Sequence, residues 1–146
     1  MVHALLECWR ALAPGGYLID LRPYSSNPAI ELVVEDGQTI VPGHINDESG
    51  VPLDVAADEA IAEVVRRGLF RLDQEAAFKF NYYWPALEDM VEYVSVRWAD
   101  FAFIPAFVLE EARQIVAELD GRYRVRVSNN MYGRAYQKVV ETKVAR

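Results

Sequence analysis

The sequence predicts an α/β domain in which amphipathic helices alternate with short apolar strands. Three observations support this prediction. A helical segment ends in a Pro-Gly-Gly turn at 14–16 and leads into a strand, an Asp-Gly pair at 36–37 separates two strand-like runs, and Pro85 and Pro105 each open an apolar helical stripe. The 146 residues, 52% hydrophobic, suffice for a single domain spanning 1–146, because no linker-like segment divides them. An α+β arrangement is the alternative fold class.

Residues 2–12 are expected to form an amphipathic helix, followed by a strand at 17–22. The inward face of the helix is predicted to hold Leu5, Cys8, Trp9 and Leu12. The nearly continuous apolar run of the strand predicts burial on both of its faces. Cys8 is interpreted as a small buried hydrophobe rather than a nucleophile. Since it is the sole cysteine, an internal disulfide is excluded and a reducing, cytoplasmic location is expected.

The middle of the chain predicts a hairpin, a loop and a second helix. The runs at 30–35 and 39–42 flank the Asp-Gly pair, which is typical of a tight turn between two strands. Residues 43–52 include few apolar side chains, so we expect this loop to be the most mobile segment. A helix follows near 54–67, and Gly68 is a suitable stop for it.

An aromatic strand is expected next, in the stretch EAAFKFNYYW. One face would carry Phe78, Phe80, Tyr82 and Trp84, and the other would carry Lys79, Asn81 and Tyr83. The first face is interpreted as core. Tyr82 and Trp84 lie nearest the strand end and have polar tips, so they are the two residues best suited to reach a pocket.

Two further helices and a closing hairpin complete the predicted fold. The apolar stripes at 85–98 and 106–119 are the longest, so these helices and the aromatic strand are expected to form the best-protected core. The last hairpin would pair 122–128 with 134–140, turned by the Asn and Gly residues within 129–133.

The net charge of −7 is unevenly distributed, because residues 121–146 hold seven basic side chains and one acidic side chain. A basic segment of this kind can bind nucleic acid. Here Arg122, Arg124 and Arg126 alternate with apolar residues, which is typical of the solvent face of a half-buried strand. We therefore predict no nucleic-acid partner. No stretch is long enough to span a bilayer, so no membrane partner is expected either.

Few motifs in the chain indicate chemistry. There is no phosphate-cradling glycine loop and no nucleophile-elbow pattern around any serine. His3 and His44 are not spaced as a metal-binding pair, so no metal site is predicted. The catalytic residues, if any exist, stay unknown at this level.

The stretch LLECWRALAPGGYLIDLRP, residues 5–23, resembles the segment of class I S-adenosylmethionine-dependent methyltransferases that follows their cofactor-binding half. In that family a helix ends in a Pro-Gly-Gly turn and feeds the fifth strand of the sheet. The stretch YYWPALEDMVEYV is similar to the substrate-side region of some bacterial members, and YRVRVSNNMYGRAYQKV resembles the sixth and seventh strands. The resemblance implies an incomplete Rossmann-like sheet, mixed in strand direction and packed by helices, with an antiparallel C-terminal hairpin.

The resemblance also implies that full-length relatives transfer a methyl group from S-adenosylmethionine to a substrate that the sequence does not identify. Their cofactor lies against a glycine-rich turn after a strand, followed by an acidic residue that binds the ribose. Both features lie upstream of the matched segment. The glycine pair at 15–16 cannot replace that turn, because it ends a helix before a strand.

We therefore expect this chain to bind no cofactor by itself and to be inactive alone. Met1 would then be either an internal methionine chosen as a start or the start of a genuine truncation. Two other functions stay open. One is a binding module whose aromatic pocket around Tyr82, Tyr83 and Trp84 holds a small ligand, and the other is a self-associating interaction protein.

Any active site is expected beyond the carboxyl end of strand 17–22, where ligands bind in open α/β sheets. The candidate substrate-binding residues are Asp20, Arg22, Tyr24, Tyr82, Trp84 and Arg97. For Asp20 we favour an internal hydrogen bond or an ion pair with an arginine. The guanidinium fork of Arg22 suits a substrate carboxylate or phosphate, although an arginine at a strand end is equally often a surface residue.

A homodimer is the expected assembly. In the resembled family the fifth strand lies between the fourth and the seventh, whereas strand 17–22 would keep only a partner at 134–140. Its other edge would expose unpaired backbone groups on an apolar strand. The interface is predicted to contain Leu18, Ile19 and Leu21, or the helix face from Leu5 to Trp9, and to bury more than roughly 1,200 Å² in total.

Overall fold

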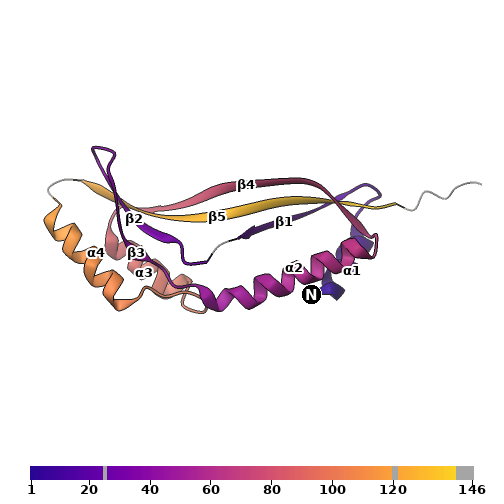
Figure 1. The fold of residues 1–146 in the computed structure, drawn as a ribbon, viewed down its shortest axis with the longest axis horizontal. Coiled ribbons are helices and arrows are strands. Elements are labelled where there is room, and N and C mark those ends of the chain that lie inside the picture. Colours follow the sequence, from indigo (N-terminus) through magenta and orange to yellow (C-terminus); the bar gives the residue numbers. More distant parts are fainter. Residues whose placement is uncertain (25, 120–121, 141–146) are drawn as a thin grey trace, which may run out of the picture. The chain divides into compact units, whose positions relative to one another are not determined.

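The computed structural model describes residues 1–24, 26–119 and 122–140 (Figure 1). Within these residues it contains four α-helices and a five-stranded antiparallel sheet, so the predicted mixture of helices and strands is confirmed. The helices are α1 (Val2–Ala11), α2 (Val51–Arg66), α3 (Leu87–Arg97) and α4 (Ala106–Glu118), with a 3₁₀ turn η1 (Glu48–Gly50). The strands are β1 (Tyr17–Pro23), β2 (Ala29–Val34), β3 (Thr39–His44), β4 (Phe70–Trp84) and β5 (Tyr123–Lys138). The end of the basic segment, 141–146, lies outside the described residues.

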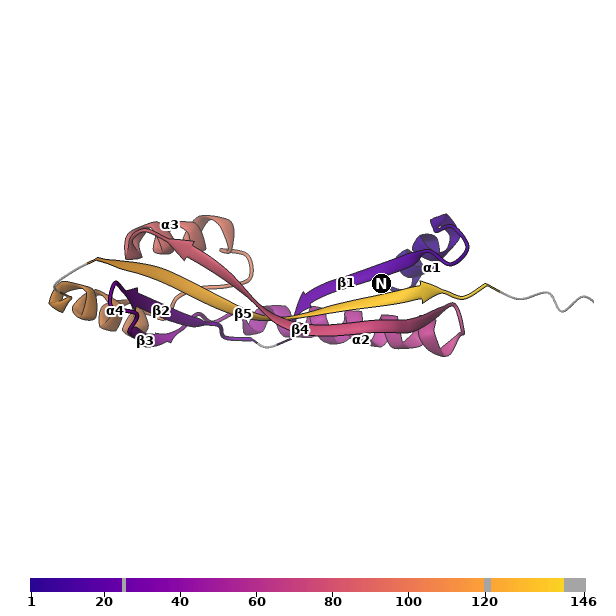
Figure 2. The ribbon, with the colours of Figure 1, turned by 90° about the horizontal axis from the view of Figure 1, so that it is seen from above.

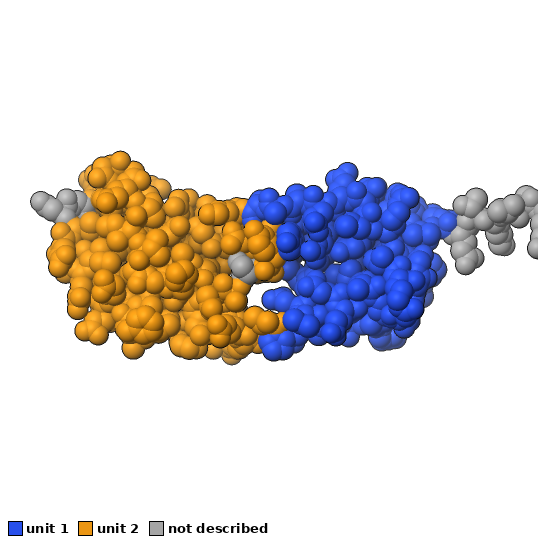
Figure 3. Space-filling model, viewed as in Figure 1, with its two compact units in different colours: residues 1–22, 52–78, 132–146 blue, residues 23–51, 79–131 orange. Residues whose placement is uncertain are grey.

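The chain forms two compact units (Figure 3). Unit 1 comprises Met1–Arg22, Pro52–Phe78 and Tyr132–Arg146, and unit 2 comprises Pro23–Val51 and Lys79–Met131. Strands β4 and β5 each contribute residues to both units, so each unit is assembled from segments that are far apart in the sequence. The expectation of a single domain stays a prediction.

Unit 1 packs α1 and α2 against one face of three strands. Figure 2 shows β5 between β1 and β4, in agreement with the strand pairing. The core consists of Ile61 and Val64 from α2, Phe70 from β4 and Tyr136 from β5, with Leu5, Leu6, Trp9 and Leu18 packed around them. Gly68, with a φ of 72°, ends α2 as predicted, because glycine adopts this left-handed conformation without steric cost.

The predicted burial of strand 17–22 on both faces is wrong. Exposed and half-buried side chains alternate along β1, with Ile19 63% and Leu21 57% exposed. Leu18 points toward the helices and packs against the unit 1 core. The apolar run of β1 therefore has one face packed against the core and one exposed apolar face. Within the described residues, α1 and α2 both contribute to the single core cluster on the packed face.

Cys8 is exposed, so its predicted burial is also wrong. The inward stripe of α1 is formed by Leu5, Leu6 and Trp9. One residue advances a helix by about 100°, so Cys8 lies to the side of the stripe that Trp9 continues.

Unit 2 has the larger core, where the predicted hairpin and both predicted helical stripes are confirmed. Strands β2 and β3 pair antiparallel, and β2 pairs with β5, placing Ile30 opposite Val127 and Leu32 opposite Val125. Helices α3 and α4 cover this core with Leu87, Met90, Val94, Val108 and Ala112, all of which are buried. At Gly43 a Cβ atom would lie 2.7 Å from a methyl of Val108, so glycine permits α4 to approach β3 closely.

Most of segment 43–52, predicted as a polar loop, has regular structure. β3 continues to His44, η1 follows, and α2 begins at Val51, three residues before the predicted start near Asp54. The backbone of Asn46 exchanges two hydrogen bonds of 2.9 Å with that of Phe103. The mobility of this segment stays a prediction.

The predicted closing hairpin is wrong, because residues 123–138 form one continuous strand, β5. Within the described residues positive φ angles occur at Asn27, Gly15, Gly37 and Gly68, so the Asn and Gly residues at 129–133 stay extended. β5 pairs with β2 near Val125 and with β1 near Lys138, and β4 pairs with it as well. A turn would remove these ladder hydrogen bonds, so the neighbouring strands keep turn-favouring residues extended.

The aromatic strand begins at Phe70, earlier than predicted, and its predicted role as core is only partly correct. Phe78 is 42% and Phe80 is 46% exposed, which contradicts a buried aromatic face along the whole strand. Tyr82 and Trp84 are half-buried, and Trp84 packs against the unit 2 core. The residues from 71 to 80 are all exposed, so this part of β4 does not belong to the best-protected core.

Candidate functional site

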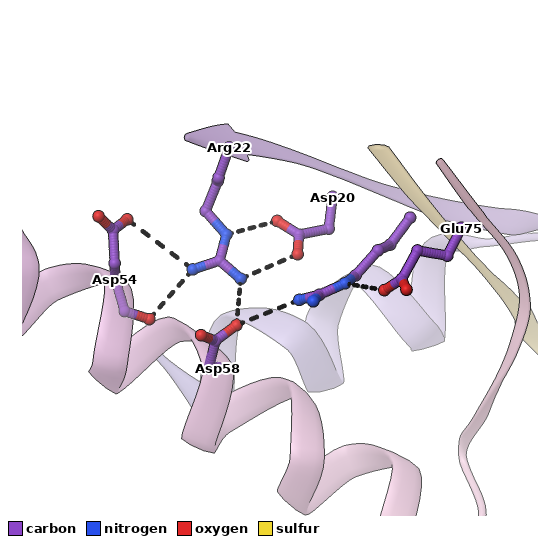
Figure 4. Close-up of polar contacts among 6 residues, drawn as sticks. Asp20, Arg22, Asp54, Asp58 and Glu75 are labelled. Carbon is purple, nitrogen blue, oxygen red and sulfur yellow. Dashed lines mark hydrogen bonds and ion pairs between the residues drawn. The ribbon is translucent and has the colours of Figure 1, made fainter. Parts of the chain in front are cut away.

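A cluster of four carboxylates and two arginines lies at the carboxyl end of β1, within unit 1 (Figure 4). Arg22 binds Asp20 through both ends of its guanidinium, with Nε–Oδ1 and Nη2–Oδ2 distances of 2.6 and 2.9 Å. It also donates to Asp58 Oδ1 at 2.6 Å and to the backbone oxygen of Asp54 at 3.0 Å. The expected pairing of Asp20 with an arginine is thus present, and the arginine is Arg22.

Arg134 on β5 closes the other side of this cluster. Its Nε donates to Glu75 on β4 at 2.6 Å, and its Nη1 lies 3.4 Å from Asp58 Oδ1. Asp54 and Asp58 are one helical turn apart on α2, so they face the two strands together. The cluster therefore connects β1, β4, β5 and α2 of unit 1.

The arrangement of charges makes this cluster a structural contact. The hydrogen bond to Asp20 raises the pKa of the Arg22 guanidinium above its usual value, and Glu75 does the same for Arg134. The bidentate contact with Asp20 occupies the fork of Arg22 that would otherwise suit a substrate carboxylate or phosphate. Four acids against two arginines also leave an excess of negative charge, which disfavours an anionic ligand at this place.

An apolar groove of about 220 Å³ runs beside β1 in unit 1. Its lining includes Ala4 and Leu5 of α1, Leu18 of β1, and Ala57 and Ala60 of α2, together with Asp20 and Arg22. In the described part of the chain β1 has a strand neighbour, β5, on one side only. The groove therefore lies beside a strand that is at the edge of the described sheet.

A second cavity, of about 180 Å³, lies within unit 2 and has aromatic walls. Its lining includes Tyr82 from β4, Trp98 and Phe101 from the segment after α3, Asp47 from the segment before η1, and Asn129 from β5. The rings of Tyr82 and Trp98 lie 5.2 Å apart at an interplanar angle of 77°, and those of Trp98 and Phe101 lie 6.1 Å apart.

Aromatic packing continues behind the cavity wall. Trp84 stacks on Tyr82 with 5.9 Å between the ring centroids, and Tyr93 of α3 lies 5.7 Å from Trp98. Such offset and edge-to-face contacts stabilise the rings beyond their area burial. The two walls formed by Tyr82 and Trp98 are thus held in place from behind.

The polar side of this cavity is fixed by a reciprocal contact between Asn27 and Asp47. The N–H of Asn27 donates to Asp47 Oδ1 at 2.6 Å, and the N–H of Asp47 lies 3.4 Å from Asn27 Oδ1. Asn27 has a φ of 58°, an uncommon conformation for a residue with a side chain. Ser49 Oγ donates to the backbone oxygen of Phe101 at 2.8 Å, which ties the segment after Asp47 to the aromatic side.

Four of the six candidate residues from the sequence lie at these two places, and Tyr24 and Arg97 lie at neither. Asp20 and Arg22 bind each other in unit 1, Tyr82 lines the unit 2 cavity, and Trp84 stacks behind it. Tyr24 is exposed and its backbone N–H donates to the oxygen of Asn130 at 3.0 Å. Arg97 is exposed at the last residue of α3.

Sequence reasoning missed Asp47, Phe101 and Asn129 as cavity residues, and it assigned Trp98 to the apolar stripe of its helix. The sequence did contain an indication of the aromatic cluster. Tyr82 and Trp84 precede α3, and Trp98 and Phe101 follow it. Aromatic residues on both sides of one short helix can converge only if the chain reverses direction. Asp47 gave no such signal, because the pairing of Asn46 with Phe103 is a tertiary contact.

Other chemistries find little support in the described residues. His3 and His44 are both exposed, and no group of three or more His, Cys, Asp or Glu side chains among these residues is arranged to hold a metal ion. Of the helices described, none is long and apolar enough to cross a membrane. No family model, curated protein or solved structure matches the chain. Inference about its function therefore rests on its own residues.

Proposed function

We propose that this chain forms the substrate-side half of a class I S-adenosylmethionine-dependent methyltransferase, with a Rossmann-like arrangement in unit 1. The observation that supports this is the strand order β1-β5-β4, with α1 and a glycine turn before β1 and α2 between β1 and β4. In the resembled family the fifth strand lies beside the seventh, and the seventh pairs with the sixth. The order in unit 1 is the one expected if β1, β4 and β5 are these three strands.

This assignment differs from the resemblance in the sequence at two points. The sheet of the described residues is antiparallel, whereas a sheet of mixed strand direction was expected. The sixth and seventh strands were expected within the terminal stretch, but that stretch is the single strand β5. Under the proposal β4 takes the role of the sixth strand and β5 that of the seventh. Unit 2 would then be an elaboration inserted after the fifth strand and between the last two, on the substrate side of the fold.

The exposed surfaces of β1 are consistent with a larger sheet. It lies at the edge of the described sheet beside an apolar groove, and Ile19 and Leu21 are exposed on the face opposite the helices. Unpaired edges and apolar patches of this kind are normally covered in folded proteins. The proposal assigns this edge to the cofactor-binding strands of full-length relatives, which would use S-adenosylmethionine as the methyl donor in the cytoplasm.

The chain alone is predicted to bind S-adenosylmethionine no tighter than millimolar. In the resembled family the glycine-rich turn and the ribose-binding acid make the main polar contacts, whereas Gly15 and Gly16 end a helix. Isothermal titration calorimetry measures this directly. A dissociation constant in the low micromolar range, or methyl transfer from labelled cofactor by the purified chain, would contradict the prediction.

The methyltransferase proposal itself is tested on the genomic DNA upstream of Met1. We expect an in-frame sequence that encodes a strand, a glycine-rich turn and an acidic residue after the next strand. The extended protein should then bind S-adenosylmethionine in the same titration. A stop codon directly upstream, or an extended protein that binds no cofactor, would count against the proposal.

Self-association is the second candidate function, supported by the same open edge of β1. The expected interface needs revision, because Leu18, Leu5 and Trp9 pack against the unit 1 core. The proposed contact therefore consists of the exposed side chains of Tyr17, Ile19 and Leu21. Light scattering should report twice the mass of 16.6 kDa, whereas a monomer at tens of micromolar would contradict this candidate.

A further inference from the structure

We infer that the aromatic cavity of unit 2 binds a small cationic amine, namely an ammonium group bearing methyl substituents. This goes beyond methyl transfer and does not depend on it, because it concerns binding by unit 2 residues alone. The inference is based on three properties of the cavity, which are its aromatic walls, its single carboxylate and its size.

The aromatic rings that line the cavity are inclined to one another. Tyr82 and Trp98 meet at 77°, and Phe101 is inclined to Trp98 by 37°. Ring faces attract cations through the quadrupole of the π system, and tryptophan is the most effective of the three aromatic side chains. Rings at large mutual angles can surround the methyl groups of an ammonium, which a single flat stack cannot do.

The charge of the lining has the sign that a cation requires. Asp47 is the acidic residue of the cavity, and none of the described residues that line it is basic. Its Oδ1 accepts one hydrogen bond from Asn27, whereas a carboxylate offers about four acceptor positions. Asn129 and Tyr82 also line the cavity, and both carry oxygen atoms that can accept hydrogen bonds from the N–H groups of a less methylated amine.

The size of the cavity favours a small ligand. Drug-sized sites have volumes of roughly 300–1,000 Å³, and a cavity of about 150 Å³ accommodates benzene. A volume of about 180 Å³ therefore suits a choline-sized molecule or the ammonium end of a longer one. Phe101 both lines the cavity and is 47% exposed, so its ring lies at the mouth.

The cavity is also preorganised. Asn27 and Glu48 are joined by a hydrogen bond of 2.9 Å, and Asn27 in turn fixes Asp47. The paired backbones of Asn46 and Phe103 hold the acidic and aromatic sides together. Asparagine adopts the left-handed conformation of Asn27 more readily than most residues, and its contacts with Asp47 and Glu48 fix it in this place.

The primary experiment compares choline with its neutral carbon isostere, 3,3-dimethylbutan-1-ol. We expect choline to bind with a dissociation constant of about 1 mM or below, and the isostere to bind about tenfold more weakly. Binding is followed by NMR on the full chain. The indole N–H of Trp98 and the amide of Ala102 should shift, whereas the indole N–H of Trp9, which belongs to unit 1, should not.

A pair of matched variants tests the carboxylate. Asp47→Asn keeps an oxygen for the Asn27 N–H but removes the charge, and we expect about tenfold weaker choline binding. Asp100→Asn removes an exposed charge next to Phe101 that does not line the cavity, and should leave the affinity within about twofold. The amide spectrum of each variant shows whether it remains folded.

Three results would overturn the inference. Equal affinity for choline and the neutral isostere would make the cavity an apolar site without preference for charge. Equal losses of affinity in the Asp47 and Asp100 variants would mean that choline is attracted by the general negative charge of the surface and not by the cavity carboxylate. Shifts confined to residues outside the cavity, or no shift with choline at all, would exclude this site as the place of binding.

Discussion

The charged cluster of unit 1 and the aromatic cavity of unit 2 differ in how far their polar groups are already hydrogen-bonded within the chain. In the cluster the guanidinium of Arg22 contacts Asp20, Asp54 and Asp58, so its hydrogen-bonding capacity is directed at the chain itself. In the cavity one carboxylate and several ring faces surround a space of about 180 Å³. A group of charged residues at the end of a strand is thus not in itself a site, because recognition needs groups left over after folding.

The largest expected effect of a substitution is the loss of stability on replacing Arg22. Arg22→Met leaves Asp20 largely buried without its bidentate partner, and removing one member of a part-buried pair costs about 2–4 kcal/mol. Urea unfolding followed by circular dichroism measures this loss. Arg10→Met, which removes an exposed pair with Glu7, is the control and should leave the midpoint unchanged.

The same variant sharpens the comparison through ligand binding. Choline affinity should be equal in Arg22→Met and the unchanged chain wherever both are folded, because no residue of the cluster lines the cavity. A loss of choline binding in this variant would show that the cluster and the cavity are coupled, and would contradict their independence.

The second largest effect is expected on replacing Phe101, which should weaken ligand binding while changing stability little, the reverse of the effect of replacing Arg22. Phe101→Leu removes a ring at the mouth of the cavity, so choline should bind several-fold more weakly. The side chain is 47% exposed, and its replacement should cost less than about 1 kcal/mol in unfolding free energy. A stability loss as large as that of Arg22→Met would mean that Phe101 acts mainly as core.

A smaller effect is expected in alkaline solution and belongs to unit 1. Burial raises the pKa of Tyr136 above 10.0, its ordinary value, because the core disfavours the phenolate. Its contribution to stability is fully present below pH 10 and is lost as the pH rises through the folded-state pKa. Tyr136→Phe should therefore flatten the decline in thermal midpoint above pH 10, and an unchanged decline would assign it to other groups.

Features that depend on residues close together in the sequence could be predicted, whereas features that depend on contacts between distant segments could not. Helix stripes such as Leu87, Met90 and Val94 and the turn at Gly37 follow from neighbours in sequence, and they were predicted correctly. The continuity of β5 could not be predicted, because the residues at 129–133 favour a turn until strands on both sides hold them extended.

The candidate site was less predictable than the fold for the same reason. Tyr82 was singled out for its place at the strand end, and it does line the cavity. Asp47 and Asn129 reach the same cavity from segments more than thirty residues away on either side, so no local pattern includes all three. The contacts of Arg22 could not be predicted either, because its partners Asp54 and Asp58 come from a helix that begins 29 residues later.

The smallest expected effect concerns the pair of Glu88 and Arg113 on the surface of unit 2. Arg113 donates to both oxygens of Glu88, at 2.9 and 3.0 Å, and this hydrogen bonding lowers the pKa of Glu88 below its ordinary value of 4.5. The contribution of this pair is therefore present above pH 4.5 and is lost as the pH falls through the folded-state pKa.

Both side chains are exposed, so solvent and salt screen the attraction and Arg113→Gln should not measurably change the unfolding midpoint at pH 7. An NMR titration of the Glu88 carboxyl should nevertheless show its pKa rising toward 4.5 in that variant, with the same rise on adding salt to the unchanged chain. If Glu88 titrated identically in both proteins, its contact with Arg113 would not persist in solution. The ion pairs around Arg22 are less exposed, so we would still expect them to persist.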